Sequence, residues 1–304
     1  MRIGSRGSQL ALWQANHIAD RLRGLGHEVS IEIIRTTGDA MQHVAFAKVG
    51  SKGMFTKEIE EALYDRRIDL AVHSLKDLPT ELDPAFAIAA IPERVDPRDA
   101  LLSAHYESFA ALPQGARVGT SSLRRRAQLR AHRDDLQFEE FRGNVDTRIR
   151  KMVEGQVDAI ILASAGLERL GLTEYRRECF APQILCPAAG QGALAIETRS
   201  GDASTRKIML ALDHASTRYA VTAERTALAA LGGGCQVPIG IHCAPDVDGE
   251  SYSIAGVVAA PEGGPLIRVE FEQQANVAAP ELGQRLAEEL LRQGARSILE
   301  GMVL

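Results

Sequence analysis

The sequence has no apolar stretch long enough to span a membrane, and no apolar signal core follows Met1. Its four cysteines form neither a C-x-x-C pair nor a zinc-ligand spacing. This usage predicts a reduced, intracellular protein without a metal site. Internal repeats and low-complexity segments are also missing. We therefore expect a cytoplasmic protein that binds neither a membrane nor a metal ion.

An excess of positive charge is missing as well. The formal net charge is -5 and the pI is about 5.9, which disfavours general binding of polyanions. The composition is that of an ordinary globular protein, with 45% hydrophobic and 25% charged residues. A chain of 304 residues can bury a large interior, and chains of this length usually divide into two or three domains.

The first segment predicts an anion site at a strand–helix junction. Residues 2–4 form a short strand, and apolar residues then recur at helical spacing up to Gly26. Either Ser5 or Ser8 can cap this helix. Arg6 lies in the junction, where the first amide groups of the helix would face a ligand. Farther on, residues 35–53 predict a long mobile loop with two lysines, Lys48 and Lys52, and such loops are usually functional.

A second polar junction follows the apolar strand 70–72. The residues after it are His73, Ser74, Lys76 and Asp77. Open α/β sheets bind ligands at the carboxyl ends of their strands. Asp77 is either a turn residue before Leu-Pro or a carboxylate that moves a proton or stabilises a cation. His73 is interpreted as structural.

The middle of the chain predicts a second α/β unit, since strands 117–119, 138–141 and 158–163 alternate with helices 123–131, 145–154 and 165–170. Residues 92–99 carry two prolines and alternating charges, which indicates a crossing between domains. Beyond residue 203, two helical segments, antiparallel strands 253–258 and 266–271, and helix 280–292 predict a small α+β domain.

Arginines are concentrated between residues 124 and 150, and in an acidic protein this excess needs a cause. Guanidinium groups bind small carboxylates and phosphates bidentately. The arginines at strand ends or helix starts are either such ligands or partners in surface salt bridges: Arg124, Arg125, Arg142 and Arg148. The others are interpreted as solvated charges on a helix face: Arg126, Arg130 and Arg133.

A glycine-rich loop presents one cysteine. Three glycines, residues 232–234, precede Cys235, and Pro238 follows shortly after. The run is either the end of a helix with an incidental cysteine or a thiol kept clear of neighbouring side chains so that a bulky partner can reach it. The local sequence leaves both interpretations open.

Seven segments together resemble the porphobilinogen deaminase (hydroxymethylbilane synthase) family, in family order and spacing over nearly the whole chain. They are Ser5–Ala11, Ala47–Gly53, His73–Asp77, Gly119–Arg125, Arg142–Val145, Gly190–Gly192 and Gly234–Pro238. The resemblance implies an α/β fold with two periplasmic-binding-protein-like domains flanking a cleft, plus a small C-terminal α+β domain. The implied domains are 1–93 with 193–212, 98–187, and 215–304.

The resemblance also implies a chemistry. Such an enzyme, a transferase of tetrapyrrole and haem biosynthesis, joins four porphobilinogen molecules head to tail with loss of ammonia and releases hydroxymethylbilane by hydrolysis. Its primer is a dipyrromethane cofactor, one per chain, held by a thioether to the loop cysteine, here Cys235. Asp77 matches the catalytic aspartate. Lys48 and Lys52 match a loop that covers the cleft, and the family implies a monomer.

The remaining site residues implied by the resemblance fall into two groups. The implied cofactor contacts are Ser74, Lys76, Thr120, Ser122, Arg124, Arg125 and Gly143. The implied substrate contacts, which hold acetate and propionate groups, are Arg6, Ser8, Arg142, Arg148, Arg169 and Gln191.

Two other classes of function compete with this interpretation. A non-enzymatic protein that binds or senses small anions would also suit two α/β lobes, but it leaves Asp77 and Cys235 without a role. A nucleic-acid-binding protein would have an affinity for DNA that falls steeply with salt concentration. The acidic pI disfavours this class of function.

Overall fold

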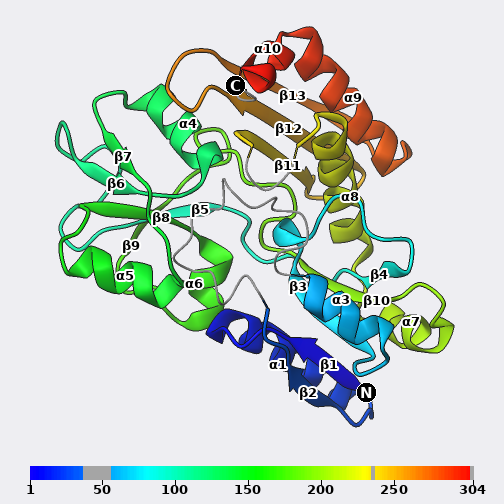
Figure 1. Cartoon of the computed structure of the whole chain (residues 1–304). Helices are drawn as coiled ribbons and strands as arrows, with labels where there is room; N and C mark the ends of the chain where they lie inside the picture. The colour runs from blue at the N-terminus through cyan, green and yellow to red at the C-terminus, as the bar shows by residue number, and fades with distance from the viewer. Residues whose placement is uncertain (37–55, 234–236, 302–304) are drawn as a thin grey trace. The chain divides into compact units, whose positions relative to one another are not determined.

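The computed structural model describes residues 1–36, 56–233 and 237–301 (Figure 1). Lys48, Lys52 and Cys235 therefore lie outside the described residues, as does most of the predicted loop 35–53. The chain divides into two compact units. The first comprises Met1–Arg94 and Ala193–Arg218, and the second comprises Val95–Gly192 and Tyr219–Leu304.

The first unit is built on a five-stranded sheet of order β2-β1-β3-β10-β4. Its strands are β1 (Arg2–Ser5), β2 (Ser30–Ile33), β3 (Leu70–Ser74), β4 (Phe86–Ala90) and β10 (Leu194–Arg199). β1 pairs in parallel with β2 and β3, whereas β10 is antiparallel to β3 and β4. Side chains alternate across the sheet, so Leu70 and Val72 pack with α1 (Gln9–Gly24), while Ala71 packs with α3 (Lys57–Tyr64). The unit also contains α7 (Ala203–Met209) and the short 3₁₀ helices η2 (Leu75–Asp77) and η3 (Leu210–Leu212).

The sheet of the second unit repeats this pattern, with order β7-β6-β8-β5-β9. The strands are β5 (Asp99–Leu102), β6 (Arg117–Gly119), β7 (Gln137–Glu139), β8 (Ala159–Ala163) and β9 (Arg176–Cys179), and the helices are α4 (Leu123–His132), α5 (Val145–Val153) and α6 (Ser164–Leu170). β6 is parallel to β7 and β8, and β5 is antiparallel to β8 and β9. The fourth strand in these orders is β10 in the first sheet and β5 in the second. β5 is the first strand after the chain enters the second unit, and β10 is the first strand after it returns to the first unit.

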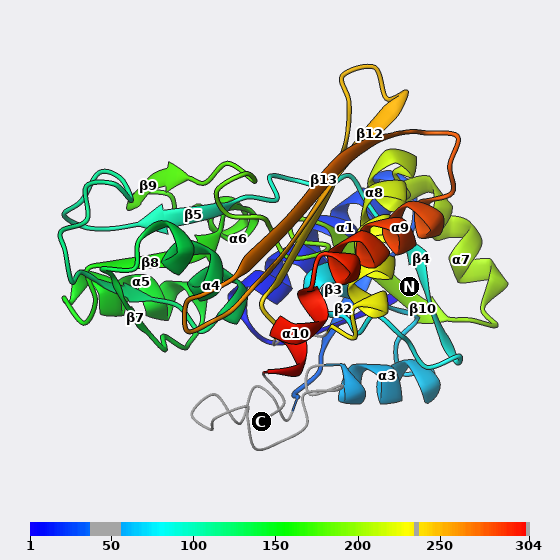
Figure 2. The same ribbon diagram turned by 90° about the horizontal axis from the view of Figure 1, so that it is seen from above.

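A smaller antiparallel sheet, β11-β12-β13, also belongs to the second unit. It comprises β11 (Ile239–Pro245), β12 (Ser251–Ala259) and β13 (Leu266–Gln274), with α8 (Ala215–Ala230), α9 (Ala279–Arg292) and α10 (Ala295–Glu300) beside it. Leu282, Leu286 and Leu290 recur at helical spacing on α9 and are buried against this sheet. Figure 2 shows α9 running along β12 and β13.

Arg126 and Arg130 of α4, and Arg133 directly after it, are not solvated helix-face charges, and that prediction was wrong. Arg126 and Arg130 both pair with Glu262 in the β12–β13 turn, at 2.5 and 3.2 Å. Arg133 pairs with Asp135 at 2.6 Å and donates to the carbonyl of Leu112 at 2.9 Å. The periodicity of α4 predicts which face points outward, but it does not reveal that a turn from a distant segment covers that face.

The predicted fold class is confirmed: the described residues form two α/β sheets and a smaller α+β part. The two α/β sheets fall into different compact units, but the second unit also contains the α+β part. The division into three domains, with its boundaries, stays a prediction. Among the strands and α-helices of the described residues, the sequence did not predict β5, β9, β11 and α10.

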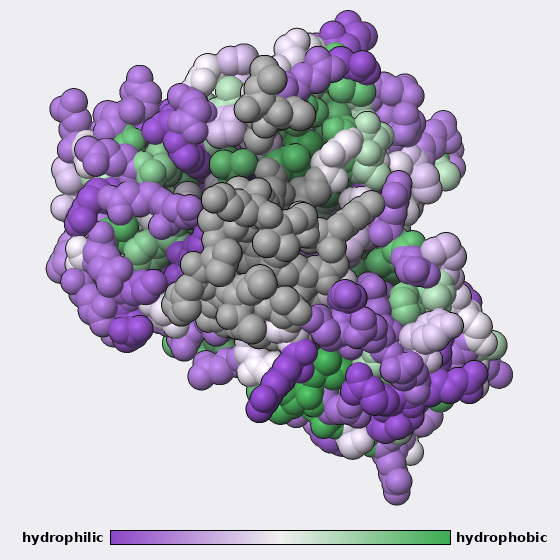
Figure 3. Space-filling model, viewed as in Figure 1, coloured by the Kyte–Doolittle hydropathy of each residue, from purple (hydrophilic) through white to green (hydrophobic). Residues whose placement is uncertain are grey.

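Hydrophobic residues are largely confined to the interior. On the face seen in Figure 3 most of the described surface is hydrophilic, and hydrophobic residues occur there in separate patches. The large apolar side chains that are exposed belong to different elements, for example Ile33 on β2 and Tyr64 on α3. Among the described residues, no helix combines the length and the apolar character needed to cross a bilayer.

Candidate active site

Asp77 is placed by a tight turn at the end of β3. Leu75 begins η2, where its amide donates to the carbonyl of Ala193 at 3.0 Å, and the amide of Leu78 closes the turn onto Leu75 at 3.2 Å. Leu75 and Leu78 are buried, with exposures of 0% and 3%. Because these two leucines anchor the turn on both sides, the Asp77 side chain between them is exposed.

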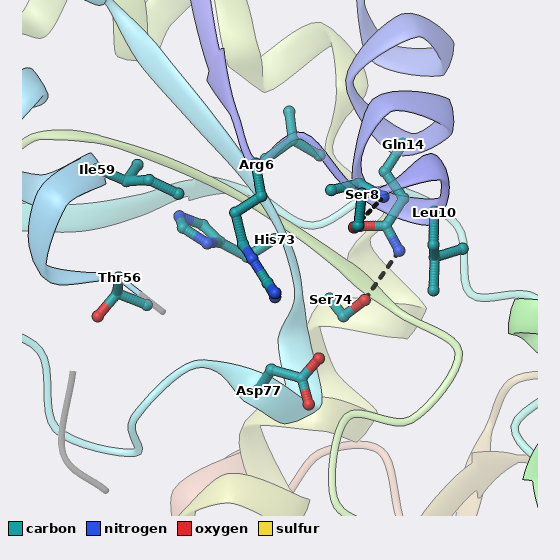
Figure 4. Close-up of a pocket in the computed structure, with 11 residues that line it drawn as sticks. Arg6, Ser8, Leu10, Gln14, Thr56, Ile59, His73, Ser74 and Asp77 are labelled. Atoms are coloured by element: carbon teal, nitrogen blue, oxygen red, sulfur yellow. Dashed lines mark hydrogen bonds between the residues drawn. The ribbon is translucent and has the colours of Figure 1, made fainter. Parts of the chain in front are cut away.

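A pocket in the first unit brings Asp77 together with three other predicted site residues. Its polar rim contains Arg6, Ser8, Ser74 and Asp77. Arg6 and Ser8 come from the β1–α1 junction, and Ser74 and Asp77 come from the end of β3. β1 and β3 are neighbouring parallel strands, so their carboxyl ends lie at one edge of the sheet. Figure 4 shows the Arg6 guanidinium and the Asp77 carboxylate pointing into the same open space, with the Ser74 hydroxyl beside them. Lys76 lies on the same turn as Asp77.

Two hydrogen bonds fix the floor of this pocket. Ser8 is the N-cap of α1, and its hydroxyl accepts from the amide of Ala11 at 3.3 Å. Gln14, only 3% exposed, donates to the Ser74 hydroxyl at 2.8 Å. Sequence reasoning missed Gln14. Its signal was present, because a polar residue stands on the helix face that otherwise buries Ala15, Ile18 and Leu22.

The predicted site residues of the second unit gather at one edge of its sheet. β6, β7 and β8 are parallel, so their carboxyl ends lie together. Thr120 and Ser122 follow β6, Arg142 and Gly143 follow β7, and Arg169 lies on the helix after β8. Cationic and hydroxyl groups at such an edge are typical of a site for anionic ligands.

Arg124 and Arg125 are deeply buried on the first turn of α4, at 4% and 7% exposure. Both pair with the fully buried Asp99 of β5, at 2.7 Å in each case. Arg124 also donates to the carbonyl of Cys186 at 2.7 Å, and Gln191 donates to Asp99 Oδ1 at 3.0 Å. Burial opposes ionisation of Asp99, but the two arginine charges outweigh it and hold the pKa of this carboxyl well below its usual range. Two cations thus share one anion here, which leaves a net positive charge.

Two hydroxyl groups organise the start of α4. The Ser122 side chain accepts from the Arg125 amide at 3.4 Å, as an N-cap does, and the Ser122 amide donates to Thr120 Oγ1 at 3.2 Å. Their polar groups therefore hold the helix terminus that carries the arginine pair.

The Arg142 segment forms the turn into α5. Arg142 is paired with Glu140, and Arg148 donates from Nε to the carbonyl of Gly143 at 2.6 Å. Gly143 has φ 124°, a conformation that favours glycine, and an added Cβ would lie 3.1 Å from the Thr147 methyl carbon. Asp146, in the first turn of α5, is exposed.

Arg169 of α6 contacts Gly192, the last residue before the chain leaves the second unit. It is 8% exposed and donates to the carbonyl of Gly192 at 2.7 Å. Burial lowers the pKa of Arg169 to about 10. Gly192 has φ 88°, and a Cβ there would meet the carbonyl oxygen of Val95 at 2.5 Å, so the two segments that link the units approach closely at this glycine.

The structure thus groups the predicted residues in two places, one in each unit. Arg6, Ser8, Ser74 and Asp77 share a pocket, with Lys76 on the same turn as Asp77. The predicted residues between Thr120 and Arg169 follow the strand ends at one edge of the second sheet. Their roles in binding a ligand remain predictions. Among the described residues, no cluster of three or more histidine, cysteine, aspartate or glutamate side chains is arranged to hold a metal ion.

The fold and the site define an α/β protein with cationic side chains at its strand ends and an exposed carboxylate in a pocket. Comparison with known families makes the assignment specific. The family model described as "Porphobilinogen deaminase, dipyromethane cofactor binding domain" matches residues 1–207, and the C-terminal domain of the same family matches residues 218–292. The chain belongs to the porphobilinogen deaminase family, as the sequence predicted.

Relatives agree with this assignment over nearly the whole chain. A porphobilinogen deaminase of Nitratidesulfovibrio vulgaris strain Miyazaki F is 49% identical over 98% of this chain and 95% of its own. One from Syntrophomonas wolfei is 48% identical over 98% and 97%. The predictions of a tetrapyrrole-biosynthesis transferase and of a dipyrromethane cofactor are confirmed, and the anion sensor is not favoured.

Solved structures with a similar course of the backbone have a much lower sequence identity to this chain. The methionine-binding protein MetQ is 12% identical with a TM-score of 0.45, over 70% of this chain and 89% of its own. A nutrient-binding protein from Burkholderia cenocepacia bound to methionine is 12% identical with a TM-score of 0.42, over 69% and 90%.

Proposed function

We propose that this chain joins four porphobilinogen molecules head to tail, releases one ammonia for each addition and frees linear hydroxymethylbilane by hydrolysis. The observation that carries the proposal is the pocket in which Asp77 and Arg6 face one space at the end of parallel strands. Porphobilinogen is a pyrrole with two carboxylates and an aminomethyl group. Such a substrate requires a cation for the carboxylates and an anion for the positive charge that develops on the ring.

The residues present fit a dipyrromethane group. The group carries carboxylates and pyrrole N–H donors, and the pocket offers a guanidinium, a hydroxyl and a carboxylate acceptor in Arg6, Ser74 and Asp77. When bound, the dipyrromethane supplies the pyrrole carbon to which the first substrate is joined. We propose Cys235 as its point of attachment, on the ground of the family segment Gly234–Pro238.

Asp77 is proposed as the catalytic residue. Its carboxylate accepts hydrogen bonds from pyrrole N–H groups and stabilises the positive charge on the substrate ring as ammonia departs. Exposure of Asp77 at the pocket lets a carboxylate reach the substrate without a prior movement of the turn, because Leu75 and Leu78 hold that turn in place. Arg6 orients the substrate by one of its carboxylates.

The edge of the second sheet is proposed to hold the other carboxylates. Each added ring brings two more negative charges, so several cations are needed to retain the product of each step. The contacts proposed there are Thr120, Ser122, Arg124, Arg125, Arg142, Gly143, Arg148, Arg169 and Gln191. We further propose that Ser8 and Lys76 contribute to the first pocket and that Lys48 and Lys52 cover the site.

The mass of the intact protein tests the proposed attachment. Purified wild-type chain is expected to be heavier than its sequence by the mass of one dipyrromethane. Cys235→Ser is expected to have the unmodified mass, because a serine hydroxyl stays protonated at neutral pH and is a far poorer nucleophile than a thiolate. A native mass spectrum of the same sample also reports oligomeric state, since one chain weighs 32.9 kDa.

The matched control is Cys179→Ser. Cys179 is a free cysteine of β9 whose sulfur lies 3.3 Å from the Ser164 hydroxyl, and its replacement is expected to leave the mass increment intact. Active wild-type enzyme with the unmodified mass would contradict the proposal, and so would an increment that persists in Cys235→Ser.

Arg142→Leu is expected to weaken retention of partly elongated product. A hydrogen bond to a charged group contributes about 1.5–3 kcal/mol, which corresponds to roughly 10- to 150-fold in affinity. Limiting amounts of porphobilinogen should therefore give fewer enzyme–intermediate complexes on anion exchange than in the wild type.

Arg150→Leu is the control for that experiment. Arg150 lies on α5, the helix that follows the Arg142 turn, pairs with Glu154 at 3.0 Å and is exposed, with 64% of its side chain accessible. Its replacement should leave the pattern of complexes unchanged. An Arg142→Leu pattern that matches both the wild type and the control would rule out the retention role.

We also propose that the protein acts as a cytoplasmic monomer. The three described cysteines are free thiols, which is the usual state in a reducing compartment.

A further inference from the structure

A buried histidine–carboxylate pair lies beside Asp77, and the proposed mechanism does not use it. His73 of β3 and Glu197 of β10 are joined by a contact of 2.9 Å between Nε2 and Oε2. Their side chains are 8% and 0% exposed. Ala195 stands opposite His73 in the antiparallel register, so Glu197 is the diagonal neighbour on the same face of the sheet. The pair therefore crosslinks the strand that ends at Asp77 to the strand that follows the crossover.

The position of this pair is costly, because a fully buried carboxylate loses its hydration. Among the described residues, Glu197 Oε1 has no hydrogen-bond partner. Glu60 of α3 faces the same region: burial and then the charge of Glu197 raise the pKa of Glu60, and His73 opposes this effect. A second carboxylate beside Glu197 adds repulsion to the cost of desolvation. A buried pair of this kind is weak evidence for stabilisation, because the cost of desolvation can exceed the Coulombic gain.

His73 also lines the pocket, but it does not face Asp77 directly. Figure 4 shows its ring turned toward Ile59 of α3, whereas the Asp77 carboxylate points into the open space near Ser74. The described residues include no hydrogen bond between His73 and Asp77. Whatever His73 does for Asp77 must therefore pass through the backbone of β3 and η2, which are continuous from Leu70 to Asp77.

We propose that His73, held by Glu197, is a positioning residue for Asp77. The Nε2–H donates to Glu197 and fixes the end of β3 relative to β10. The carbonyl of Ala193, the residue before β10, accepts from the Leu75 amide. Two crosslinks to the same neighbouring segment, one on each side of Ser74, define where η2 begins and so where the Asp77 carboxylate lies. This inference rests on the proposed function.

Two isosteric substitutions of His73 separate the hydrogen bond from the ring. The side-chain amide nitrogen of glutamine lies where Nε2 lies and can still donate to Glu197, whereas that of asparagine corresponds to Nδ1 and falls short. His73→Asn is expected to lower kcat about 10- to 100-fold with KM within about twofold, since small misplacements of a catalytic group cost that much. His73→Gln should restore kcat to within about threefold of the wild type.

A double-mutant cycle with Asp77→Glu tests whether His73 acts through Asp77. Glutamate keeps a carboxylate at position 77 but displaces it by one methylene. The rate of this variant therefore no longer depends on accurate placement of the turn. In the Asp77→Glu background, His73→Asn is expected to lower kcat less than about threefold. If the two residues acted independently, His73→Asn would lower kcat by the same factor in both backgrounds. Thr198→Val is the control, because Thr198 is a buried neighbour on β10 whose hydroxyl has no partner among the described residues.

Three results would overturn the inference. They are equal costs of His73→Asn in both backgrounds, a His73→Gln variant as impaired as His73→Asn, and a lowered unfolding temperature with unchanged kcat. Should His73→Asn fail to fold, Glu197→Gln against Glu197→Leu provides the same comparison from the other partner. Wild-type protein that neither carries the mass increment nor consumes porphobilinogen would instead refute the proposed function, and this inference with it.

Discussion

Asp77→Asn is expected to reduce turnover at least a hundredfold while leaving the fold and the cofactor-derived mass increment in place. A positioned carboxylate contributes about 10²–10⁴-fold through proton transfer, and stabilisation of developing charge adds to this. Asparagine has the same shape but no charge. Because Asp77 is exposed and the turn is anchored by Leu75 and Leu78, the unfolding temperature should change little. Steady-state formation of hydroxymethylbilane and intact mass, measured on one preparation, check both parts.

Asp65→Asn is the matched control for Asp77→Asn. Asp65 is an exposed carboxylate at the end of α3, outside the pocket. Its variant should turn over at the wild-type rate. Near-normal turnover of Asp77→Asn would show that the carboxylate is not the main catalytic group.

Asp99→Ala is expected to destabilise the second unit by about 3–5 kcal/mol, because it leaves two buried guanidinium groups without their shared counter-charge. Arg124 and Arg125 are less than 10% exposed, so solvent cannot replace the lost carboxylate without a local rearrangement. Urea unfolding followed by circular dichroism measures the effect. Glu154→Ala, which breaks the exposed Arg150–Glu154 pair, should cost only about 0.3–0.5 kcal/mol.

The contribution of Asp99 also has a defined dependence on pH. Its pKa in the folded protein lies below the usual value near 3.8, so folding favours the ionised form. The stabilisation is therefore complete above about pH 4 to 5 and is lost as the pH falls through the lower, folded-state pKa. The difference in stability between wild type and Asp99→Asn should be largest at neutral pH and shrink in acid. A difference that does not vary between pH 7 and pH 3 would contradict the ion-pair interpretation.

The amino-acid sequence predicts much of the fold, since most of its elements carry a clear period. The helix that buries Leu282, Leu286 and Leu290 and the apolar strand Ala159–Ala163 are examples. β9 was missed because Arg176–Cys179 has no apolar alternation, and β5 because Asp99 follows a segment rich in proline and charge. Short strands of this kind are specified by their neighbours in the sheet and not by their own residues.

For the site, the sequence predicted that several candidate residues lie together, but it did not predict which partners they contact. Arg6, Ser74 and Asp77 lie in one pocket, as expected for residues at adjacent strand ends. The acids that partner buried groups could not be found in this way: Asp99 is 25 residues from Arg124, and Glu197 is 124 residues from His73. Such pairings depend on the register of strands from distant segments, which no local pattern encodes.

The order of the strands has a consequence for the order of folding during synthesis. In the first sheet β10 lies between β3 and β4, so β4 has no partner in that sheet until the ribosome has translated Leu194–Arg199. All strands of the second α/β sheet come from one continuous segment, Asp99 to Cys179. The nascent chain can therefore complete the sheet in the middle of its sequence before the one at its beginning. The Asp77 turn is anchored to the carbonyl of Ala193, so this anchor is also translated only after the arginine-bearing edge.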